Sequence, residues 1–485
     1  MAGLSGTNFI QISPLLAMVV MVFVLLGYDL ISRKQNHKNL LWITASGLAL
    51  ISIGTLFFMN ELTSTQPMWG GLLRFDPAGF SMMALICAGA AITAVFATLE
   101  SELVDHGEFP VLLVAATFGL SLMTVSADLV MLYLAMEMSA IPLYVLAGFL
   151  IHNQQSTEAG LKYLLYGAMA SAVMLYGFSL LYGMSGATNF VEITAAIKNN
   201  QVPFLPLAIS FVLILVGFGY KIAAVPFHFW APDVYHGAPN QVSGFLATAS
   251  KAAGFVVLLR FIPVIFPLLH VPLQIILSVM AVVTMLTGNL LAMQQKNIKR
   301  LLAYSSIAHA GYLLMGVAAA TPEGGTSVFY YLTGYLFTNL AAFTLAAIAS
   351  RQTGSEEISS YSGLSRRSPG LALMFLIVFL SLAGIPPFAG FAGKMFVFLS
   401  TARAGLNWLV VVGVINSIIA LFYYLNVMKV IYARPESEGQ NVQSFSYSAA
   451  LRIALAICLT AILYFGILYL PWYNLLSQAG NMLWK

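Results

Sequence analysis

Charged side chains are scarce in this chain of 485 residues: only 8% are Asp, Glu, Lys or Arg, whereas 60% are hydrophobic. A soluble globular chain carries about 25% charged residues, so this composition excludes a soluble enzyme and indicates a polytopic membrane protein. The net charge of +4 comes from basic residues scattered through loops. Nucleic acid is therefore not expected as a partner, because it would require a basic face.

Cysteine is nearly absent as well. Cys87 and Cys458 both lie inside apolar runs, so we expect buried free thiols and no disulfide. Two cysteines cannot hold an iron–sulfur cluster, which takes four ligands, and the seven histidines show no metal-binding spacing. The chain has no Walker A loop, GxSxG motif or Rossmann fingerprint, and the loop "GGLLRF" (70–75) has no phosphate-binding pattern.

Long apolar runs dominate what is present. A helix needs about 20 apolar residues to cross a bilayer, so the sequence predicts an all-α integral membrane protein with about fourteen transmembrane helices. The first run lacks a preceding basic segment and a clear cleavage site, so we expect a retained helix. The expected spans are 11–31, 39–59, 78–100, 109–126, 127–151, 159–183, 204–236, 241–262, 272–293, 300–320, 327–350, 370–402, 406–432 and 447–471.

The seventh and twelfth runs are over-long and interrupted. Pro226 and Pro232 interrupt the seventh, and "AGIPPFAGFAGK" (383–394) interrupts the twelfth. Proline removes a backbone donor, and unsatisfied backbone is tolerated at membrane depth only inside protein or beside a wet cavity. The sequence therefore predicts discontinuous helices 7 and 12 in the bundle interior. They are five spans apart, which reverses their direction as an inverted repeat would.

The distribution of Lys and Arg predicts the orientation in the membrane. With the N-terminus outside, twelve basic residues fall on the inner side, five on the outer side and four within spans. We therefore predict that both termini lie on the outer side of a bacterial plasma membrane. An organellar membrane is the alternative location, because organelle-encoded chains also lack a transit peptide. The outer five are Arg74, Lys198, Arg260, Arg403 and Lys485.

Ionisable side chains stand inside several predicted spans. A charge at the bilayer centre costs about 2.5–3.5 kcal/mol, so we expect these groups to face inward, near one another and near water. Burial lowers the affinity of an amine for its proton and a nearby carboxylate restores it, so such amines can bind and release protons. The residues are Glu137, Lys162, Lys221, Lys251, His309 and Lys394.

Plainer roles are open for some of these positions. Lys162 lies four residues after Glu158, so a helix-end ion pair explains it equally well. A hydrogen-bonded core histidine is an equal alternative for His309. For Asp233, in "WAPDVYHGAP", we expect a role in a turn or helix cap.

Four stretches carry a family resemblance: "MEMSAIPLYVL" (136–146), "KIAAVPFHFWAPDVYHGAPNQVSGFLATASK" (221–251), "NIKRLLAYSSIAHAGYLLMG" (297–316) and "SLAGIPPFAGFAGK" (381–394). They resemble the antiporter-like membrane subunits of proton-pumping NADH:quinone oxidoreductase, respiratory complex I. The resemblance extends over spans four to thirteen. "PDVYHGAP" followed by "TASK" is similar to subunit N, the homologue of the mitochondrial second membrane subunit.

The resemblance implies a fold of fourteen helices with two inverted five-helix repeats. The expected divisions are 1–108 for helices 1–3, 109–262 for the first repeat, 263–433 for the second repeat and 434–485 for helix 14. The family's functional residues match Glu137, Lys221, Lys251 and Lys394. Lys162 matches a further lysine of the sixth helix, and His309 matches a polar tenth-helix position more loosely.

The implied function is a proton-translocating subunit with no redox chemistry of its own. Protons would enter from the inner side and pass through Lys221, Lys251 and Lys394 along a hydrated axis, while Glu137 would tune Lys221. Quinone reduction elsewhere in the complex would drive the transfer. The resemblance places no cofactor in this chain and assigns NADH, FMN, iron–sulfur clusters and quinone to partner subunits. The expected partners are neighbouring membrane-arm subunits, the peripheral arm indirectly, and the lipid bilayer.

Two other functions stay open from the sequence. The chain is also compatible with a subunit of a multisubunit sodium/proton antiporter, which would not purify with a flavin and iron–sulfur arm. A scaffold that moves no protons is the other alternative. A scaffold would accept leucine at Lys251 and Lys394, because hydrophobic replacement of buried ions can even stabilise a protein.

Overall fold

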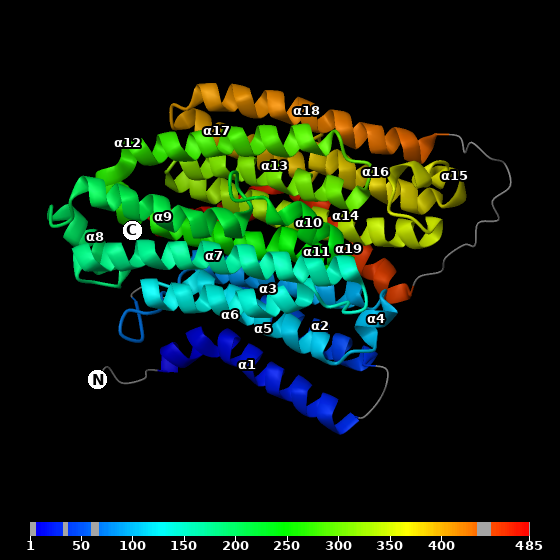
Figure 1. The fold of residues 1–485 in the computed structure, drawn as a ribbon, viewed down its shortest axis with the longest axis horizontal. Coiled ribbons are helices and arrows are strands. Elements are labelled where there is room, and N and C mark those ends of the chain that lie inside the picture. Colours follow the sequence, from blue (N-terminus) through cyan, green and yellow to red (C-terminus); the bar gives the residue numbers. More distant parts are fainter. Residues whose placement is uncertain (1–5, 33–36, 60–66, 434–447, 485) are drawn as a thin grey trace.

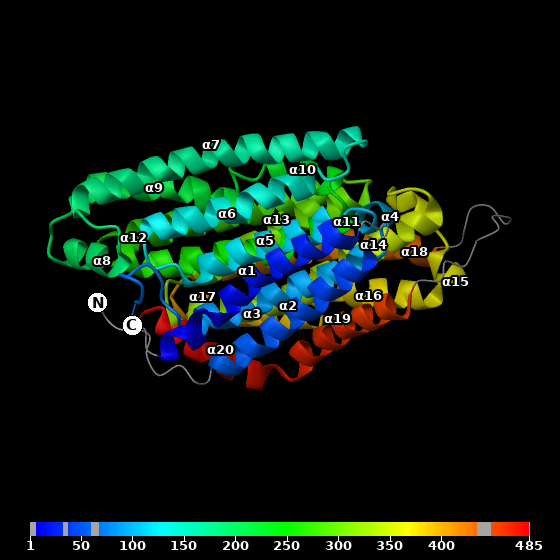
Figure 2. The same cartoon turned by 90° about the horizontal axis from the view of Figure 1, so that it is seen from below.

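The computed structural model describes residues 6–32, 37–59, 67–433 and 448–484, which are almost entirely helical. Figures 1 and 2 show long helices that run side by side in an elongated bundle. Thirteen described helical stretches are long and apolar enough to cross a membrane. The long helices are α1 (Gly6–Ser32), α2 (Lys38–Met59), α3 (Pro77–Ala97), α5 (Glu108–Val125), α6 (Leu129–Ala147), α7 (Gln154–Ser185), α9 (Phe204–Ile222), α12 (Lys251–Ala292), α13 (Ile298–Ala318), α14 (Pro322–Thr353), α18 (Asn407–Tyr432) and α19 (Ala449–Ile467).

Shorter helices connect or extend the long ones, and the all-α membrane fold predicted from the sequence is confirmed. The short elements are α4 (Ser101–Val104), α8 (Phe190–Lys198), α10 (Trp230–Gly237), α11 (Asn240–Phe245), the π-helix η1 (Leu246–Ser250), the 3₁₀ helix η2 (Ile358–Tyr361), α15 (Leu364–Arg367), α16 (Pro369–Ala383), α17 (Ala389–Arg403) and α20 (Tyr469–Met482).

The predicted fourteen spans and the thirteen observed stretches differ at one place, the twelfth run. This run is divided into α16 and α17, each of 15 residues, which alone are too short to cross a bilayer. The seventh run is also interrupted: α9 ends at Ile222, and α10 begins at Trp230. Pro226 lies in the first interruption, and Pro386 and Pro387 lie in the second. Pro232, which we also expected to interrupt the chain, lies inside α10. The inverted repeats and their boundaries stay predictions.

The expected separation of spans eight and nine is only partly correct. We expected residues 263–271 to connect them, but α12 continues through this stretch to Ala292. The helix contains Pro263, Pro267 and Pro272 and departs from helical backbone angles at Leu269. Proline removes an intrahelical hydrogen bond and bends a helix without always ending it, so the two spans meet at a kink rather than a loop.

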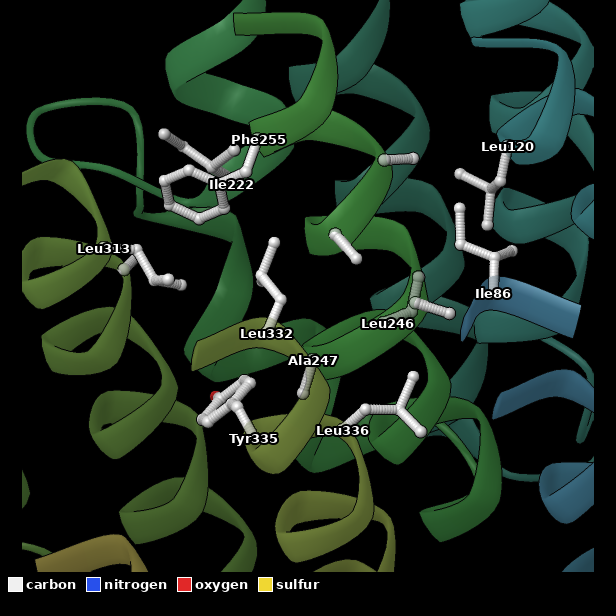
Figure 3. Packing of buried hydrophobic residues seen from close by; sticks show 14 of the residues in the cluster. Ile86, Leu120, Ile222, Leu246, Ala247, Phe255, Leu313, Leu332, Tyr335 and Leu336 are labelled. Carbon is white, nitrogen blue, oxygen red and sulfur yellow. The ribbon is translucent and has the colours of Figure 1, made fainter. Parts of the chain in front are cut away.

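The interior of the bundle is formed by α3, by α11 with η1 and the first half of α12, and by α13 and α14, whose residues are nearly all buried. Figure 3 shows Leu332, Tyr335 and Leu336 of α14 beside Leu246 and Ala247 of η1. Outer helices such as α1, α2, α7 and α18 expose large apolar side chains. Apolar surface on the outside is the arrangement expected of a protein surrounded by lipid and apolar partners.

The beginning of α1 and the end of α20 lie at the same end of the bundle, and α4 and α15 lie at the opposite end (Figures 1 and 2). This arrangement is compatible with both termini on one side, although the side itself stays a prediction. The orientation also relied on residues outside the described part of the chain, namely Arg33, Lys34, Arg434 and Lys485.

The C-terminal segment contains a helix that we did not predict. We expected one span over 447–471, but α19 ends at Ile467, and the separate helix α20 packs against α14 and α3. The indole Nε1 of Trp472 donates to Thr333 Oγ1 on α14 at 3.2 Å. Helix α20 is short and partly polar, so it lacked the long apolar run that marked the other helices.

Helices α5 and α6 make a close approach that predicts a stability effect. A Cβ at Gly119 would lie 2.4 Å from Ser139 N, whereas a Cβ at Gly183 of α7 would meet nothing within 4 Å. We expect Gly119→Ala to destabilise the purified protein by about 1–3 kcal/mol through overpacking. Gly183→Ala should be neutral or stabilising, because alanine favours a helix more than glycine does. Thermal unfolding in detergent measures both, and equal midpoints would contradict the prediction.

Candidate functional site

Glu137 of α6 and Lys221 of α9 do not form a direct ion pair. Ser171 Oγ of α7 donates a hydrogen bond to Glu137 Oε1. The buried Lys221 amine donates to Ser139 Oγ, two residues after Glu137, at 3.0 Å. The charge of Glu137 still acts electrostatically on the Lys221 amine, although the two groups are not in direct contact. The acid and the amine are therefore coupled electrostatically, while each is held by a neutral hydroxyl.

At the interruption after Lys221, backbone groups freed from the helix form hydrogen bonds with side chains of other helices. Val225 N donates to Thr284 Oγ1 of α12 at 3.0 Å, and the indole Nε1 of Trp230 donates to Tyr220 O at 3.1 Å. Unpaired backbone groups cannot be left in lipid, so these bonds allow a helix to end beside a buried amine. Lys221 itself is buried, but Pro226 and Phe229 in the interruption are exposed, so the expectation of a break inside the bundle is only partly correct.

Lys251 begins α12 directly after the π-helix η1 and is buried. Its amine donates to Ser306 Oγ at 2.6 Å and to Ser306 O at 2.7 Å, both on α13. One turn later on α12, a Cβ at Gly254 would lie 3.1 Å from Lys221 Cγ. The absence of a side chain at Gly254 therefore lets Lys221 pack against the helix that carries Lys251.

His309 of α13 is buried and lies within electrostatic reach of both the Lys251 and the Lys394 amines. Its Nδ1 lies 2.6 Å from Tyr331 OH of α14, and its Nε2 lies 3.3 Å from Tyr424 OH of α18. Both ring nitrogens of the buried imidazole therefore have hydroxyl partners. A neutral imidazole donates from one nitrogen and accepts at the other, and hydroxyls serve in either role.

Lys394 of α17 lies at the interruption between α16 and α17. Its amine donates to Leu382 O at 3.1 Å, to Ala383 O at 3.0 Å and to Ser417 Oγ of α18 at 3.1 Å. The carboxyl end of a helix carries partial negative charge, so the end of α16 is a favourable place for an ammonium group. Gly384 has φ +85°, and a Cβ there would lie 2.9 Å from Lys394 Cδ, so glycine provides both the turn and the space.

Glu137, Lys221, Lys251, His309 and Lys394 are together called the proton row below. Lys162 does not join them and lies in an ion-pair cluster near the surface. Its amine is 2.7 Å from Glu158 Oε1, as the i, i+4 spacing predicted, and 2.7 Å from Asp233 Oδ2. Asp233 Oδ1 also accepts from Arg300 Nη1 at 2.9 Å. The expectation that Asp233 serves in a turn or cap is wrong, because it lies inside α10 and joins α7 to α13.

Beside this cluster lies a cavity of about 130 Å³ that is lined by polar and charged side chains. The buried Lys299 donates to Ala238 O at 2.8 Å and lies 3.6 Å from Glu356 Oε1. His236 Nε2 is 3.7 Å from Glu356 Oε2. Burial and then the Lys299 charge lower the pKa of His236 below its ordinary value, so the imidazole is neutral near pH 7.

Further polar groups between this cavity and Lys251 were missed by the sequence analysis. The buried hydroxyls of Tyr235 and Tyr335, and both amide atoms of Asn339, have no hydrogen-bond partner among the described residues. The two tyrosines lie near Ser306, the partner of Lys251. Serine within an apolar run gave no signal, because a short hydroxyl side chain often bonds only to its own helix, as Thr117 does to Leu113 O. Tyrosine and asparagine gave none because a single helix does not show what their polar atoms meet.

The described residues contain no group of three or more His, Cys, Asp or Glu side chains able to hold a metal ion. Cys87 and Cys458 are free and buried, as predicted. The arrangement is thus a row of amines, an imidazole, a carboxylate and hydroxyls, which is chemistry suited to proton transfer.

Comparison with known proteins gives a consistent result. Residues 126–420 match the family described as "NADH:quinone oxidoreductase/Mrp antiporter, TM". The NADH-quinone oxidoreductase subunit N of Moorella thermoacetica is 40% identical over 452 residues, which cover 93% of this chain and 94% of that protein.

Solved structures show the same fold. A chain of respiratory complex I from Thermus thermophilus with bound aureothin aligns with a TM-score of 0.79 and 32% identity, covering 94% of this chain and 97% of that chain. A chain of the Mrp complex from Dietzia sp. aligns with a TM-score of 0.84 and 98% coverage of both chains, but at 21% identity this likeness shows the fold alone.

The Asp233 cluster predicts a stability effect with a defined pH dependence. Burial raises the pKa of Asp233, but hydrogen bonds from Lys162 and Arg300 outweigh burial and leave the pKa below its ordinary value. The stabilisation is therefore complete above about pH 4 and is lost only as the pH falls through the lower folded pKa. Because Asp233 is 39% exposed, each pair contributes about 0.2–1 kcal/mol.

We accordingly expect Asp233→Asn to lower the thermal unfolding midpoint by a similar amount at every pH between about 5.5 and 8. Glu192→Gln is the matched control, because this exposed α8 carboxylate forms no ion pair among the described residues. A deficit that disappears by about pH 5.5 would contradict the assignment.

Proposed function

This chain belongs to the family of antiporter-like membrane subunits of NADH:quinone oxidoreductase, and we propose that it carries protons across the membrane within such a complex. Quinone reduction elsewhere in the complex drives the transfer. The chain itself performs no redox step, and NADH, FMN, iron–sulfur clusters and quinone belong to partner subunits. Its partners are the neighbouring membrane-arm subunits, as the multisubunit assemblies of the structural relatives support.

One observation carries the proposal: each buried lysine amine in the row is hydrogen-bonded to a serine hydroxyl on another helix. The pairs are Lys221 with Ser139, Lys251 with Ser306, and Lys394 with Ser417. A hydroxyl accepts a bond from an ammonium and donates one to a neutral amine. Both protonation states of the lysine therefore keep a partner, which a fixed carboxylate would not provide equally.

His309 links the second and third amines. An imidazole takes a proton at one nitrogen and releases one from the other, so it suits a position between two proton sites. Tyr331 and Tyr424 hold both nitrogens, and Tyr424 also meets Ser305. In this proposal the proton passes Lys221, Lys251, His309 and Lys394 in turn, and Glu137 tunes the proton affinity of Lys221.

Protons are taken up at the end of the bundle that carries α10 and the beginning of α13. The cavity beside His236, Lys299 and Glu356 supports this assignment. Buried polar groups without protein partners are normally satisfied by bound water, and Tyr235 and Tyr335 are such groups between the cavity and Ser306. This end faces the inner side if both termini lie outside a bacterial plasma membrane, as the basic residues predict.

A sodium/proton antiporter subunit is the second candidate, because the Mrp chain has the same fold. The proteins that purify with this chain in mild detergent distinguish the two. A flavin and iron–sulfur arm supports the first function, and its absence supports the second.

Lys221→Ala and Glu137→Ala test the first proton site. Both variants should assemble, yet coupled quinone reduction and proton pumping per electron should fall about tenfold or more, because positioned proton-transfer groups contribute ~10²–10⁴ in rate. Ser139→Ala keeps the amine but removes its hydroxyl, so an intermediate loss is expected. Lys429→Ala, at an exposed lysine of α18, is the control. Unchanged pumping per electron in both Lys221→Ala and Glu137→Ala would refute the assignment.

Lys251→Leu and Lys394→Leu separate a proton carrier from a scaffold. A scaffold would keep full pumping, since leucine replaces a buried amine without an unpaired charge. A proton carrier should assemble normally and lose most of its pumping in each variant. The measurement is acidification by vesicles containing the intact complex, normalised to electrons transferred.

A further inference from the structure

Three of the five basic residues predicted on the outer side converge on one cavity, although they are far apart in the sequence. Arg74 precedes α3, Lys198 ends α8, and Arg260 lies within α12. They line a cavity of about 350 Å³, and no acidic side chain is among the described residues that line it. Helix α8 and the C-terminal end of the chain lie at the same end of the bundle in both views (Figures 1 and 2).

The carboxylate of Asp76, beside these basic residues, already accepts hydrogen bonds at both of its oxygens. Asp76 is completely buried and accepts from Arg260 Nη1 at 2.8 Å and Nη2 at 2.6 Å, and from Gly79 N at 2.8 Å. Burial raises the pKa of Asp76, but Arg260 and then Arg74 outweigh it and hold the pKa below its ordinary value. Asp76 is therefore a permanent anion committed to Arg260.

Arg74 is left with incomplete compensation. Its Nε lies 3.4 Å from Asp76 Oδ2 and has no hydrogen bond within the described part of the chain, while Nη2 donates to Met482 O at 3.0 Å. Burial lowers the pKa of Arg74, Asp76 opposes this effect, and Arg260 adds to it. Two guanidinium groups thus share one carboxylate, and the exposed Lys198 adds a third positive charge. An added anion would lower the electrostatic energy of this group.

The remaining walls are mainly apolar, with Ser126 and Thr194 as polar exceptions. Phe190 of α8, Val264 of α12, and Leu483 and Trp484 after α20 border the same cavity. The cavity lies where spanning helices end, so its apolar side meets the level of the lipid headgroups. A cavity with basic side chains on one side and apolar walls on the other fits an amphipathic anion better than a small, fully hydrated anion.

We propose that this cavity binds the phosphate group of an anionic phospholipid, with Arg74 and Lys198 as its cationic ligands and Arg260 as the buried support. Guanidinium and ammonium groups bind phosphate oxygens through charge-assisted hydrogen bonds. The lipid anchors α8, the beginning of α3 and the segment after α20 to one another. This site is independent of the proton row.

The test uses the intact purified complex in nanodiscs that contain phosphatidylglycerol and phosphatidylcholine in equal amounts. Native mass spectrometry then counts each lipid retained on this chain after release from the complex. Wild type should retain phosphatidylglycerol preferentially, and Arg74→Gln with Lys198→Gln should reduce its retention about tenfold. The control is Arg403→Gln, at a basic residue predicted on the same side that pairs with Glu323 outside the cavity.

Lys198→Glu alone guards against a folding defect, because Lys198 is exposed at the end of α8. It should lower retention of phosphatidylglycerol while quinone reduction stays at the wild-type rate. Equal retention of both lipids by wild type, or unchanged retention in the variants, overturns the proposal. Displacement of phosphatidylglycerol by millimolar inorganic phosphate would also overturn it, because the site would then serve a free anion.

Discussion

A buried ammonium group must keep oxygen partners, and this constraint organises the middle of the protein. The amines of Lys221, Lys251 and Lys394 each donate a hydrogen bond to a serine hydroxyl. Lys251 and Lys394 also donate to backbone carbonyl oxygens. Isolated charges at this depth would cost several kcal/mol. Neutral oxygen partners reduce that cost without fixing the proton in place, as a tight ion pair would.

The helix interruptions follow from the same requirement. At Lys394 the end of α16 exposes carbonyl groups that an unbroken helix would use internally. Gly384 and Gly254 then leave the space into which the lysine stems fit. Near Lys221 the freed backbone is satisfied by Thr284 and Trp230 from packed neighbours. The backbone at these interruptions is therefore irregular, and its freed groups are satisfied by side chains.

The two ends of the bundle differ in their electrostatics. At the end with α10 and the beginning of α13, opposite charges alternate in the cluster of Lys162, Asp233 and Arg300. At the end where α1 begins and α20 ends, Arg74 and Arg260 share Asp76 and leave positive charge uncompensated. The first end suits proton uptake by a polar cavity, and the second suits an anionic headgroup.

The sequence by itself determined the all-α membrane fold, most of the spans, the approximate places of the two interruptions and which ionisable side chains stand inside apolar runs. These features are local, because a membrane helix satisfies its own backbone within one segment and a charge in an apolar run is visible without its neighbours. The tertiary structure alone decided which hydroxyl meets each amine, that Asp233 joins Lys162 to Arg300, and that Arg74, Lys198 and Arg260 share one cavity. Those contacts join residues distant in the sequence, and serine or arginine in a single segment carries no information about its partner on another helix.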